Sequence, residues 1–341
     1  MPSVQDIDLA GLPKVELHLH IEGTLEPELI FELAERNKMR LRWANVGELV
    51  SRYRFGSLQD FLDLYYDNIC VLREEADFYD LTKAYLARAA ADHVRHTEIF
   101  FDLQAHTSRG VALEAVLGGV TSALEAGARE HGVTSGLILS FLRDRPAEEA
   151  MELLTRVLHL GAPIIGIGLD SSELGNPPSK FRSVFEYARA SGLRCVAHAG
   201  EEGPPEYVQE ALDVLGVARI DHGNRSIEDE VLVERLVADE VPLTLCPLSN
   251  VMLGVVRRLA DHPVANMLER GLLVTINSDD PAYFGGYIGE NYRQLIGTFD
   301  LDRTTVARLA KNAVSAAFID GTRRSGLLEE VGCWEAGERE S

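Results

Sequence analysis

Cysteine is scarce in this sequence and too widely spread to build a disulfide framework. The chain has four cysteines in 341 residues, Cys70, Cys195, Cys246 and Cys333, and no two of them form a CxxC pair. Folds that depend on disulfides carry dense, closely spaced cysteines, whereas reduced thiols are typical of the cytoplasm. We therefore expect a cytoplasmic protein without disulfides.

Positive charge and long apolar runs are also in short supply. Lysine and arginine number 33 against 54 aspartates and glutamates, which gives a formal net charge of -21 and a pI of about 4.9. A surface of this sign repels phosphate backbones and anionic lipid headgroups. No apolar run approaches the length that spans a bilayer, and the first residues lack a basic segment followed by an apolar stretch. The sequence argues against nucleic acid, membrane insertion and secretion, and leaves the oligomeric state open.

The sequence does contain a regular alternation of short apolar runs with longer amphipathic helical patterns. Such alternation is typical of parallel sheets built from βα units. Eight runs predict strands at 14–20, 97–103, 136–142, 164–170, 195–200, 219–223, 242–249 and 274–280. They indicate an α/β fold, a (β/α)8 TIM barrel, and barrels of this size commonly form one domain. We expect a single domain over residues 1–341, with its core at about 12–325.

Two segments depart from this pattern. The first connection, about residues 25–93, is much longer than one crossover helix and contains several helical stretches, so extra helices are expected to cover one mouth of the barrel. The last segment, 326–341, is polar and has few candidate core residues. It is expected to form a loosely ordered tail.

Histidines and an aspartate fall at the carboxyl ends of predicted strands. His18 and His20 end the first strand, His198 the fifth and Asp279 the eighth. These ends converge on one mouth of a barrel, and alternate residues such as His18 and His20 share a face. Three imidazoles and one carboxylate suit a catalytic zinc ion. Each residue taken singly could instead be a core histidine or a helix cap, so the zinc hypothesis depends on the whole set.

Two further strand-end residues are candidates for proton chemistry. Zinc lowers the pKa of a bound water from about 15.7 toward about 7, and this supplies a nucleophile at neutral pH. Glu201, three residues after His198, could deliver a proton to the substrate and later to its leaving group. His222 could hold the zinc-bound water or help to deprotonate it, and so stabilise the oxygen as it becomes negative. The alternatives are a favourable charge at a helix start for Glu201 and a core position for His222.

Substrate contacts are expected from residues next to these. Asp280 follows Asp279 and points elsewhere, and the fourth strand ends in Asp170-Ser171-Ser172-Glu173, where Asp170, Ser171 and Glu173 could meet the substrate edge. Helix capping is the alternative for Asp280 and for the serines. The fourth strand ends without a lysine that could be carbamylated to bridge two metals, so one zinc ion is expected.

Five motifs, in order, resemble one enzyme family. PKVELHLHIEGT, VAHAGEEG, IDHG, LCPLSN and INSDDP are together similar to the adenosine and adenine deaminases of the amidohydrolase superfamily, over about residues 12–320. The resemblance implies a distorted (β/α)8 barrel with one zinc that replaces the exocyclic amine of a 6-aminopurine with oxygen. The family's functional positions match the following residues here: His18, His20, His198 and Asp279 as ligands, Glu201 as proton donor to N1, His222 as the water-orienting histidine, and Asp280 as the residue facing the purine at N7.

Glu22 is where the sequence departs from adenosine deaminases. Those enzymes typically carry HxDG or HxDA, whereas HIEGT resembles the adenine deaminase branch. A side chain longer by one methylene would intrude where ribose sits. Free adenine is therefore favoured as substrate, with hypoxanthine and ammonia as products and purine salvage as the context. Adenosine or N6-substituted adenines are the alternative substrates, and a metal-stabilised barrel without turnover is a third hypothesis.

Overall fold

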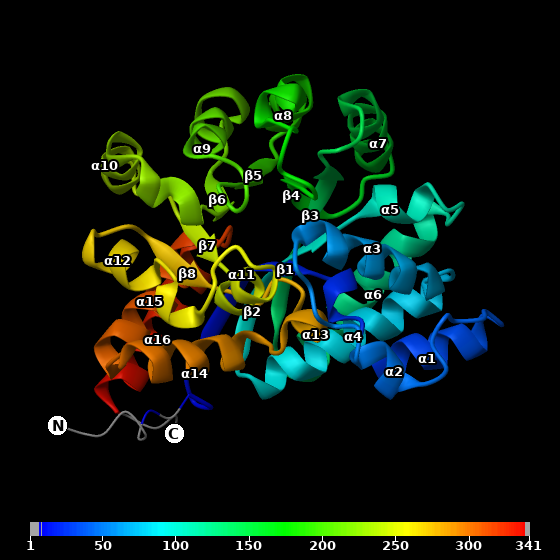
Figure 1. The fold of residues 1–341 in the computed structure, drawn as a ribbon, viewed down its shortest axis with the longest axis horizontal. Helices are drawn as coiled ribbons and strands as arrows, with labels where there is room; N and C mark the ends of the chain where they lie inside the picture. The colour runs from blue at the N-terminus through cyan, green and yellow to red at the C-terminus, as the bar shows by residue number, and fades with distance from the viewer. Residues whose placement is uncertain (1–6, 8, 338–341) are drawn as a thin grey trace.

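A barrel of eight parallel strands forms the centre of the computed structural model, which describes residue 7 and residues 9–337 (Figure 1). The strands pair in chain order, and the expected (β/α)8 architecture is confirmed. Their bounds are β1 Lys14–His20, β2 Val94–Phe101, β3 Thr134–Leu142, β4 Ile164–Asp170, β5 Arg194–Ala199, β6 Arg219–His222, β7 Leu243–Leu245 and β8 Val274–Ile276.

The barrel closes between its first and last strands at residues that are candidate metal ligands. Leu19 and Asp279 form an isolated parallel bridge. The backbone N–H of His20 donates to the carbonyl of Asp279 at 3.0 Å, and the N–H of Asp279 donates to the carbonyl of His18 at 3.1 Å. The candidate ligands on strands one and eight are thus joined through the backbone.

The predicted strands agree best where the whole run is buried on both faces. The runs at 14–20 and 164–170 coincide with β1 and β4. The run at 97–103 lies too far along the chain, because β2 ends at Phe101 and the chain turns at Asp102 into helix α5. The last two runs are too long, because β7 and β8 have three residues each and lead into short helices that start at Pro247 and Pro281. Proline at the first position of a helix is favoured, since its missing N–H would have no partner there.

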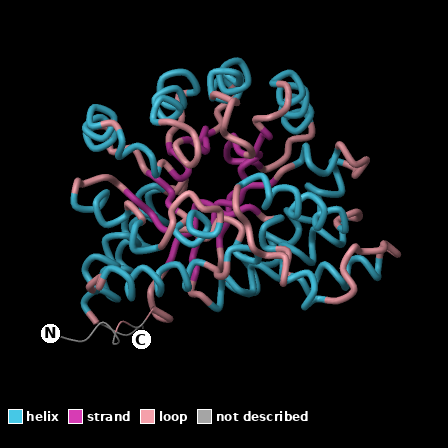
Figure 2. The backbone as a smooth tube through the Cα atoms, viewed as in Figure 1, coloured by secondary structure: helices cyan, strands magenta, loops and turns pink. Residues whose placement is uncertain are grey.

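Helices surround the strands on the outside of the barrel, as Figure 2 shows in cyan. Among the described residues, no helix combines the length and the apolar composition of a membrane span. The helices after β2 are α5 Leu103–Thr107, α6 Leu113–His131, α7 Ala147–His159, α8 Arg182–Ala190, α9 Pro205–Glu210 with the π-helical turn Ala211–Leu215, α10 Glu230–Ala238, α11 Pro247–Met252, α12 Val264–Glu269, α13 Pro281–Phe284, α14 Ile288–Phe299, α15 Arg303–Ala316 and α16 Gly321–Ala336, with 3₁₀ turns at Pro178–Phe181, Asn224–Glu228 and Leu259–Asp261.

The long first connection contains the extra helices that its sequence predicted. They are a 3₁₀ turn at Glu22–Thr24, α1 Pro27–Arg36, α2 Val46–Val50, α3 Leu58–Asn68, a 3₁₀ turn at Ile69–Val71, and α4 Glu75–Ala91. The Ser57 side chain caps α3 by accepting from the N–H of Asp60. Residues of α3 line the pocket described below, so this connection covers the mouth of the barrel.

The expectation of a loosely ordered tail from residue 326 is wrong for the part that the structure describes. Helix α16 continues to Ala336, and Leu327, Val331 and Trp334 are buried. The Asp320 side chain caps its start by accepting from the N–H of Arg323. Most residues of this segment are polar or glycine. For this reason the spacing of four and three residues, which puts the three buried side chains on one face of the helix, was not recognised in the sequence. Residues 338–341 lie outside the described range.

Candidate functional site

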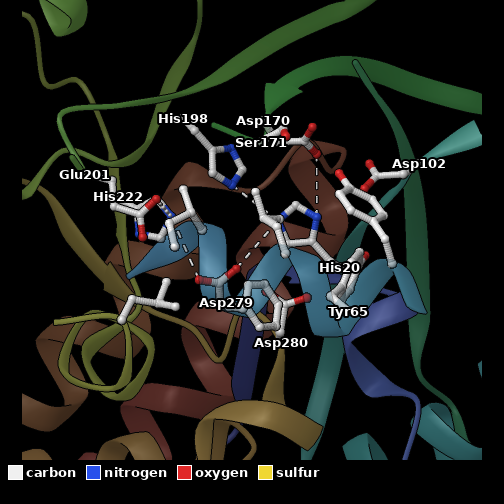
Figure 3. Close-up of a pocket in the computed structure, with 15 residues that line it drawn as sticks. His20, Tyr65, Asp102, Asp170, Ser171, His198, Glu201, His222, Asp279 and Asp280 are labelled. Atoms are coloured by element: carbon white, nitrogen blue, oxygen red, sulfur yellow. Dashed lines mark hydrogen bonds and ion pairs between the residues drawn. The ribbon is translucent and has the colours of Figure 1, made fainter. Parts of the chain in front are cut away.

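His20 and His198, at the ends of β1 and β5, and Asp279, shortly after β8, meet at one mouth of the barrel (Figure 3). His18 belongs to the same strand as His20. Asp279 Oδ1 lies 3.4 Å from His18 Nε2 and 3.5 Å from His20 Nε2. His20 Nε2 lies 3.2 Å from His198 Nε2. All four side chains are buried, with at most 7% of any residue exposed. The structure therefore brings together four residues that are up to 261 positions apart in the sequence.

These separations fit a shared metal ion. Ligand atoms about 2.0–2.1 Å from a tetrahedrally coordinated zinc lie about 3.3 Å apart, close to the three measured distances. His18 Nε2 has no hydrogen-bond partner among the described residues, although it is buried. Burial lowers the pKa of His20 to about 4 and that of His198 well below its usual value, so both imidazoles are neutral, as metal ligands must be.

The outer nitrogen of His18 has a defined partner. Its Nδ1 lies 2.9 Å from Thr244 Oγ1, and that hydroxyl donates its one hydrogen to Asp221 Oδ1 at 2.9 Å. The hydroxyl can therefore only accept from His18, whose hydrogen is placed on Nδ1. The Nε2 lone pair is left facing the cluster, in the way that second-layer partners usually orient metal-binding histidines.

The Nδ1 atoms of the other two candidate histidine ligands, His20 and His198, also lie near a possible hydrogen-bond acceptor. His20 Nδ1 lies 3.6 Å from Asp170 Oδ2, and His198 Nδ1 lies 3.7 Å from Asp221 Oδ2. A carboxylate beside Nδ1 favours hydrogen on that nitrogen. Their Nε2 atoms are thereby free to offer lone pairs to a metal.

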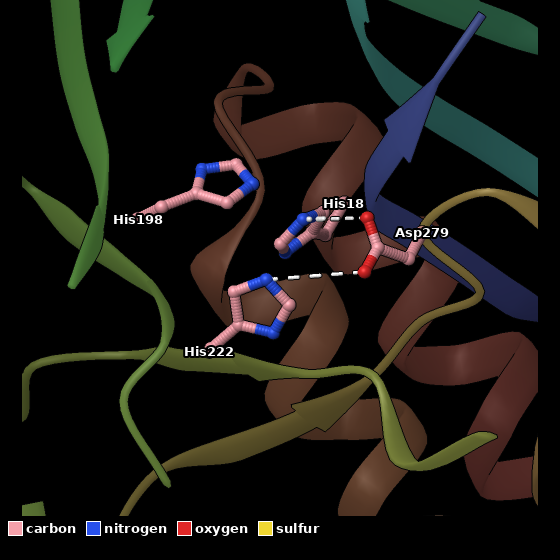
Figure 4. A group of neighbouring side chains, drawn as sticks. All are labelled: His18, His198, His222 and Asp279. Atoms are coloured by element: carbon pink, nitrogen blue, oxygen red, sulfur yellow. Dashed lines mark ion pairs between the residues drawn. The ribbon is translucent and has the colours of Figure 1, made fainter. Parts of the chain in front are cut away.

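His222 lies in the same cluster, so the geometry offers a second, overlapping set of possible ligands. One donor atom from each of His18, His198, His222 and Asp279 lies within 4.8 Å of the others (Figure 4). His222 Nε2 is 3.5 Å from Glu201 Oε2 and 3.8 Å from Asp279 Oδ2. Its Nδ1, however, faces a side-chain amide, Asn250 Nδ2 at 3.4 Å, and not a carboxylate.

Three of the predicted site residues have left-handed backbone conformations. The φ angles are 69° for Ser171, 63° for His222 and 67° for Asp279. Such angles are unfavourable for residues with a side chain and cluster at functional sites, where they aim a group that a relaxed backbone would direct elsewhere. Each of the three follows or ends a strand, at the mouth of the barrel.

Glu201 is buried beside His222, and its Oε1 has no hydrogen-bond partner among the described residues. Burial and the neighbouring Asp279 carboxylate raise the pKa of Glu201 well above its usual value. The protonated acid is thereby favoured, which is the form that can donate a proton.

Glu173, a candidate substrate contact from its sequence position, instead holds the loop that carries Glu201 and does not line the pocket. Its buried carboxylate accepts hydrogen bonds from four consecutive backbone N–H groups at 2.7–3.1 Å, those of Gly200, Glu201, Glu202 and Gly203. The backbone around the candidate acid is fixed by these bonds.

A pocket opens above the cluster. Polar groups from the strand ends and apolar side chains from α3 share its lining, which consists of His20, Leu58, Phe61, Leu62, Tyr65, Tyr66, Asp102, Asp170, Ser171, His198, Glu201, His222, Leu253, Asp279 and Asp280. The predicted contacts Ser171 and Asp280 are both among them.

Asp280 is packed against the turn that follows β1. A Cβ on Gly23 would lie 2.0 Å from Asp280 Oδ1 and 2.6 Å from its Cα, so only glycine allows this approach. Burial and the Asp279 carboxylate raise the pKa of Asp280 well above its usual value. The protonated form that a contact with an unprotonated ring nitrogen requires is thus favoured.

Glu22 is not part of the pocket lining. It is fully buried, and its Oε1 accepts from His106 Nε2 at 2.7 Å and from the backbone N–H of Asp102 at 3.1 Å. Arg109 donates to His106 Nδ1 at 2.7 Å, which leaves the hydrogen of His106 on Nε2, toward Glu22. Glu22 therefore binds the backbone of Asp102, a residue of the pocket wall, without lining the pocket itself.

That wall residue, Asp102, was missed in the sequence. Its side chain lines the pocket, the residue is 3% exposed, and its Oδ1 has no hydrogen-bond partner among the described residues. Figure 3 shows Asp102 on the opposite side of the pocket from Glu201 and His222. The signal was present, because Asp102 directly follows the last residue of β2, and a place at a strand end is the criterion that singled out His198 and Asp279.

Comparison with known proteins gives one consistent result. The model of the family described as adenosine deaminase matches residues 13–334. A protein of Streptomyces coelicolor named adenine deaminase is 58% identical over 325 residues, 95% of this chain and 96% of the relative. The crystal structure of an adenine deaminase from Arthrobacter aurescens superposes with a TM-score of 0.94 at 55% identity, covering 95% of this chain and 99% of that one.

A more distant structure carries a metal. An amidohydrolase from Burkholderia ambifaria with bound zinc has a TM-score of 0.89 and 25% identity, over 99% of this chain and 95% of that chain. The predicted resemblance to adenosine and adenine deaminases is confirmed, with relatives that bear the name of the adenine branch. This chain belongs to the adenosine deaminase family.

Proposed function

We propose that the chain hydrolyses adenine to hypoxanthine and ammonia with one zinc ion held by His18, His20, His198 and Asp279. The observation that carries the proposal is the convergence of Asp279 Oδ1 on two imidazole nitrogens, at 3.4 and 3.5 Å, on the floor of a pocket that also contains a buried acid. The relatives named adenine deaminase, at 54–58% identity, support the reaction.

The metal assignment is supported by the chemistry of the donor set. Three imidazoles and a carboxylate are ligands that zinc accepts, and the related Burkholderia structure contains zinc. When bound, zinc would supply a water whose pKa is lowered from about 15.7 toward about 7. The remaining chemistry can be assigned to side chains of the chain itself.

Glu201 would protonate N1 of the purine as the oxygen attacks C6, would then take up the proton of the hydroxyl formed at C6, and would pass it to the departing amine. Attack at C6 breaks the aromaticity of the ring and places negative charge on N1, so an acid at N1 lowers the barrier. His222 would donate a hydrogen bond to the attacking oxygen as it becomes negative. Asp280, in its protonated form, would donate a hydrogen bond to N7 of the purine. Hydrolysis then exchanges one C–N bond for one C–O bond and releases ammonia.

The far wall of the pocket supports free adenine over adenosine. With N1 at Glu201 and C6 above the cluster, the N3 and N9 edge of the base faces the opposite side, where Asp102 lies. Burial and the neighbouring Asp170 raise the pKa of Asp102 well above its usual value, and the oxygen of the protonated acid that carries no hydrogen would accept the N9–H of adenine. Adenosine has no hydrogen on N9, and its ribose would press against the wall that Glu22 supports. Glu22 would thus act on substrate choice through Asp102.

The test is ammonia release and absorbance change by the zinc-loaded protein with adenine, adenosine and N6-methyladenine in parallel. We expect the highest kcat/KM with adenine. A higher value with adenosine or N6-methyladenine would refute the choice of substrate while leaving the chemistry intact. Release of ammonia from none of the three would favour a barrel that binds metal without turnover.

A further inference from the structure

A chain of three hydrogen bonds connects a backbone amide to His222. The N–H of Val264 donates to His262 Nδ1 at 3.2 Å, and His262 Nε2 lies 3.1 Å from Asn250 Oδ1. Asn250 Nδ2 in turn lies 3.4 Å from His222 Nδ1. His222, Asn250 and His262 are at most 3% exposed, so water does not compete for these contacts.

The direction of every bond in this chain is fixed by its first member. A backbone N–H can only donate, so His262 Nδ1 must accept, and the hydrogen of the neutral ring is on Nε2. Burial lowers the pKa of His262 to about 4, which keeps the ring neutral near pH 7. His262 Nε2–H needs an acceptor, so Asn250 presents Oδ1 to it. The amide Nδ2 of Asn250 is then left to donate to His222 Nδ1.

We propose that Asn250 and His262 are positioning residues that hold His222 in the tautomer with hydrogen on Nε2. His222 then presents a hydrogen to the cluster, whereas His18, His20 and His198 present lone pairs. No comparison or sequence motif assigns such a role to His262, which lies outside the pocket lining.

The chain of hydrogen bonds from Val264 through His262 and Asn250 to His222, called the relay below, decides which of the two overlapping sets of ligands can hold the metal. His222 is near enough to bind the same metal ion, since it lies with His18, His198 and Asp279 within 4.8 Å. An imidazole with hydrogen on Nε2 has no lone pair there to offer. The relay therefore excludes His222 from the ligands and leaves it as a donor toward the attacking oxygen. This second consequence rests on the proposed function, whereas the tautomer itself does not.

The most informative variant is Asn250→Asp. It keeps the shape of the side chain but replaces the donor that faces His222 Nδ1 with an acceptor. Either oxygen of the aspartate can still accept from His262 Nε2–H, but neither can donate to His222 Nδ1. His222 should then move its hydrogen to Nδ1 and turn a lone pair toward the cluster. The matched control is Asn266→Asp, the same chemical change at an exposed position on α12.

The direct measurement is the nitrogen NMR spectrum of ¹⁵N-histidine-labelled protein, recorded metal-free and zinc-loaded near pH 7.5. We expect the His222 signals of the unaltered protein and of Asn266→Asp to show hydrogen on Nε2, and those of Asn250→Asp to show it on Nδ1. Hydrogen on Nδ1 in the unaltered protein, or an unchanged tautomer in Asn250→Asp, would overturn the proposal. This measurement needs no turnover, so it stands apart from failure of the proposed function.

The kinetic expectation separates positioning from general support of the fold. Reversing a catalytic histidine's tautomer in a protease lowers kcat by about 10⁴-fold, so Asn250→Asp should lower kcat by roughly 10²–10⁴-fold with KM changed less than about fivefold. His262→Gln retains an N–H donor for Asn250 and should keep kcat within about tenfold, whereas His262→Leu should lose much more. Equal losses in His262→Gln and His262→Leu, or full activity in Asn250→Asp, would contradict the relay. Should Asn250→Asp fail to fold, the two His262 variants and their His222 spectra still decide the question.

Discussion

The carboxylate of Glu22 accepts a hydrogen bond from the backbone N–H of Asp102 at 3.1 Å, one layer behind the pocket wall. The residue that sets this sequence apart from adenosine deaminases is therefore not among the residues that line the pocket. Its influence on the choice between adenine and adenosine would pass through Asp102, which lines the pocket and whose Oδ1 has no hydrogen-bond partner among the described residues.

Replacing Asp102 should narrow the discrimination between adenine and 9-methyladenine. The methylated base lacks N9–H, so the unaltered enzyme should favour adenine, and Asp102→Ala should lose about 10- to 100-fold in kcat/KM for adenine alone. Parallel kinetics on the two bases measure this. Asp144→Ala is the control, because it removes an exposed carboxylate outside the pocket lining. Equal loss on both bases would show that Asp102 does not recognise N9.

Glu201→Gln should retain zinc and lose turnover. The amide has nearly the same shape but cannot give up and regain a proton, so kcat should fall by roughly 10²–10⁴-fold, the usual contribution of general acid–base catalysis. Metal analysis and initial rates on the same preparation check both halves. Activity within tenfold of the unaltered protein would remove Glu201 from the acid role.

Metal content distinguishes the two possible ligand sets. His20→Ala and His198→Ala should hold well under one zinc per chain after dialysis, whereas His222→Ala should retain about one. The exposed His159 on α7 supplies the control variant His159→Ala. A loss of zinc in His222→Ala together with its retention in His20→Ala would replace our ligand set with the alternative that contains His222.

Removing the metal should also lower the thermal stability of the folded protein. A ligand that binds only the native state stabilises it, so chelation should lower the melting temperature and added zinc should restore it. Scanning calorimetry with and without a chelator measures the shift. An unchanged melting temperature after verified removal of zinc would argue against a buried site of this kind.

His262 should make stability depend on pH between about 6.5 and 4. Burial lowers its pKa to about 4 in the folded state, while the unfolded chain keeps about 6.5. Above pH 6.5 His262 is neutral in both the folded and the unfolded state, so its titration does not change the free energy of unfolding there. As the pH falls below 6.5 only the unfolded state gains the proton, so stability should drop, by about 1 kcal/mol at pH 5.5.

The variant His262→Gln isolates this contribution. It has no titrating ring at this position, so its free energy of unfolding should fall less between pH 7.5 and 5.5 than that of the unaltered protein. Urea unfolding at the two pH values measures the difference, and other titrating groups cancel in the comparison. Parallel pH dependence in the two proteins would show that His262 is not buried as a neutral ring.

The barrel was predictable because parallel strands buried on both faces read as continuous apolar runs, as in residues 164–170. The grouping of His18, His20, His198 and Asp279 was predictable too, because the carboxyl ends of the strands in a barrel converge on one mouth. Features that depend on long-range packing were not predictable. The contact of Glu22 with His106, 84 residues away, and the bond from His262 to Asn250 leave no periodic trace in the sequence. Helix α16 was missed because its three buried side chains stand among polar residues.

We propose that adenine is deaminated in this pocket with the help of a bound zinc ion. The most direct test is a spectrophotometric comparison of adenine and adenosine on the zinc-loaded protein, with ammonia measured in the same samples. We predict conversion of adenine to hypoxanthine with stoichiometric ammonia, and a kcat/KM for adenine well above that for adenosine. Failure to convert adenine, or a clear preference for adenosine, would contradict it.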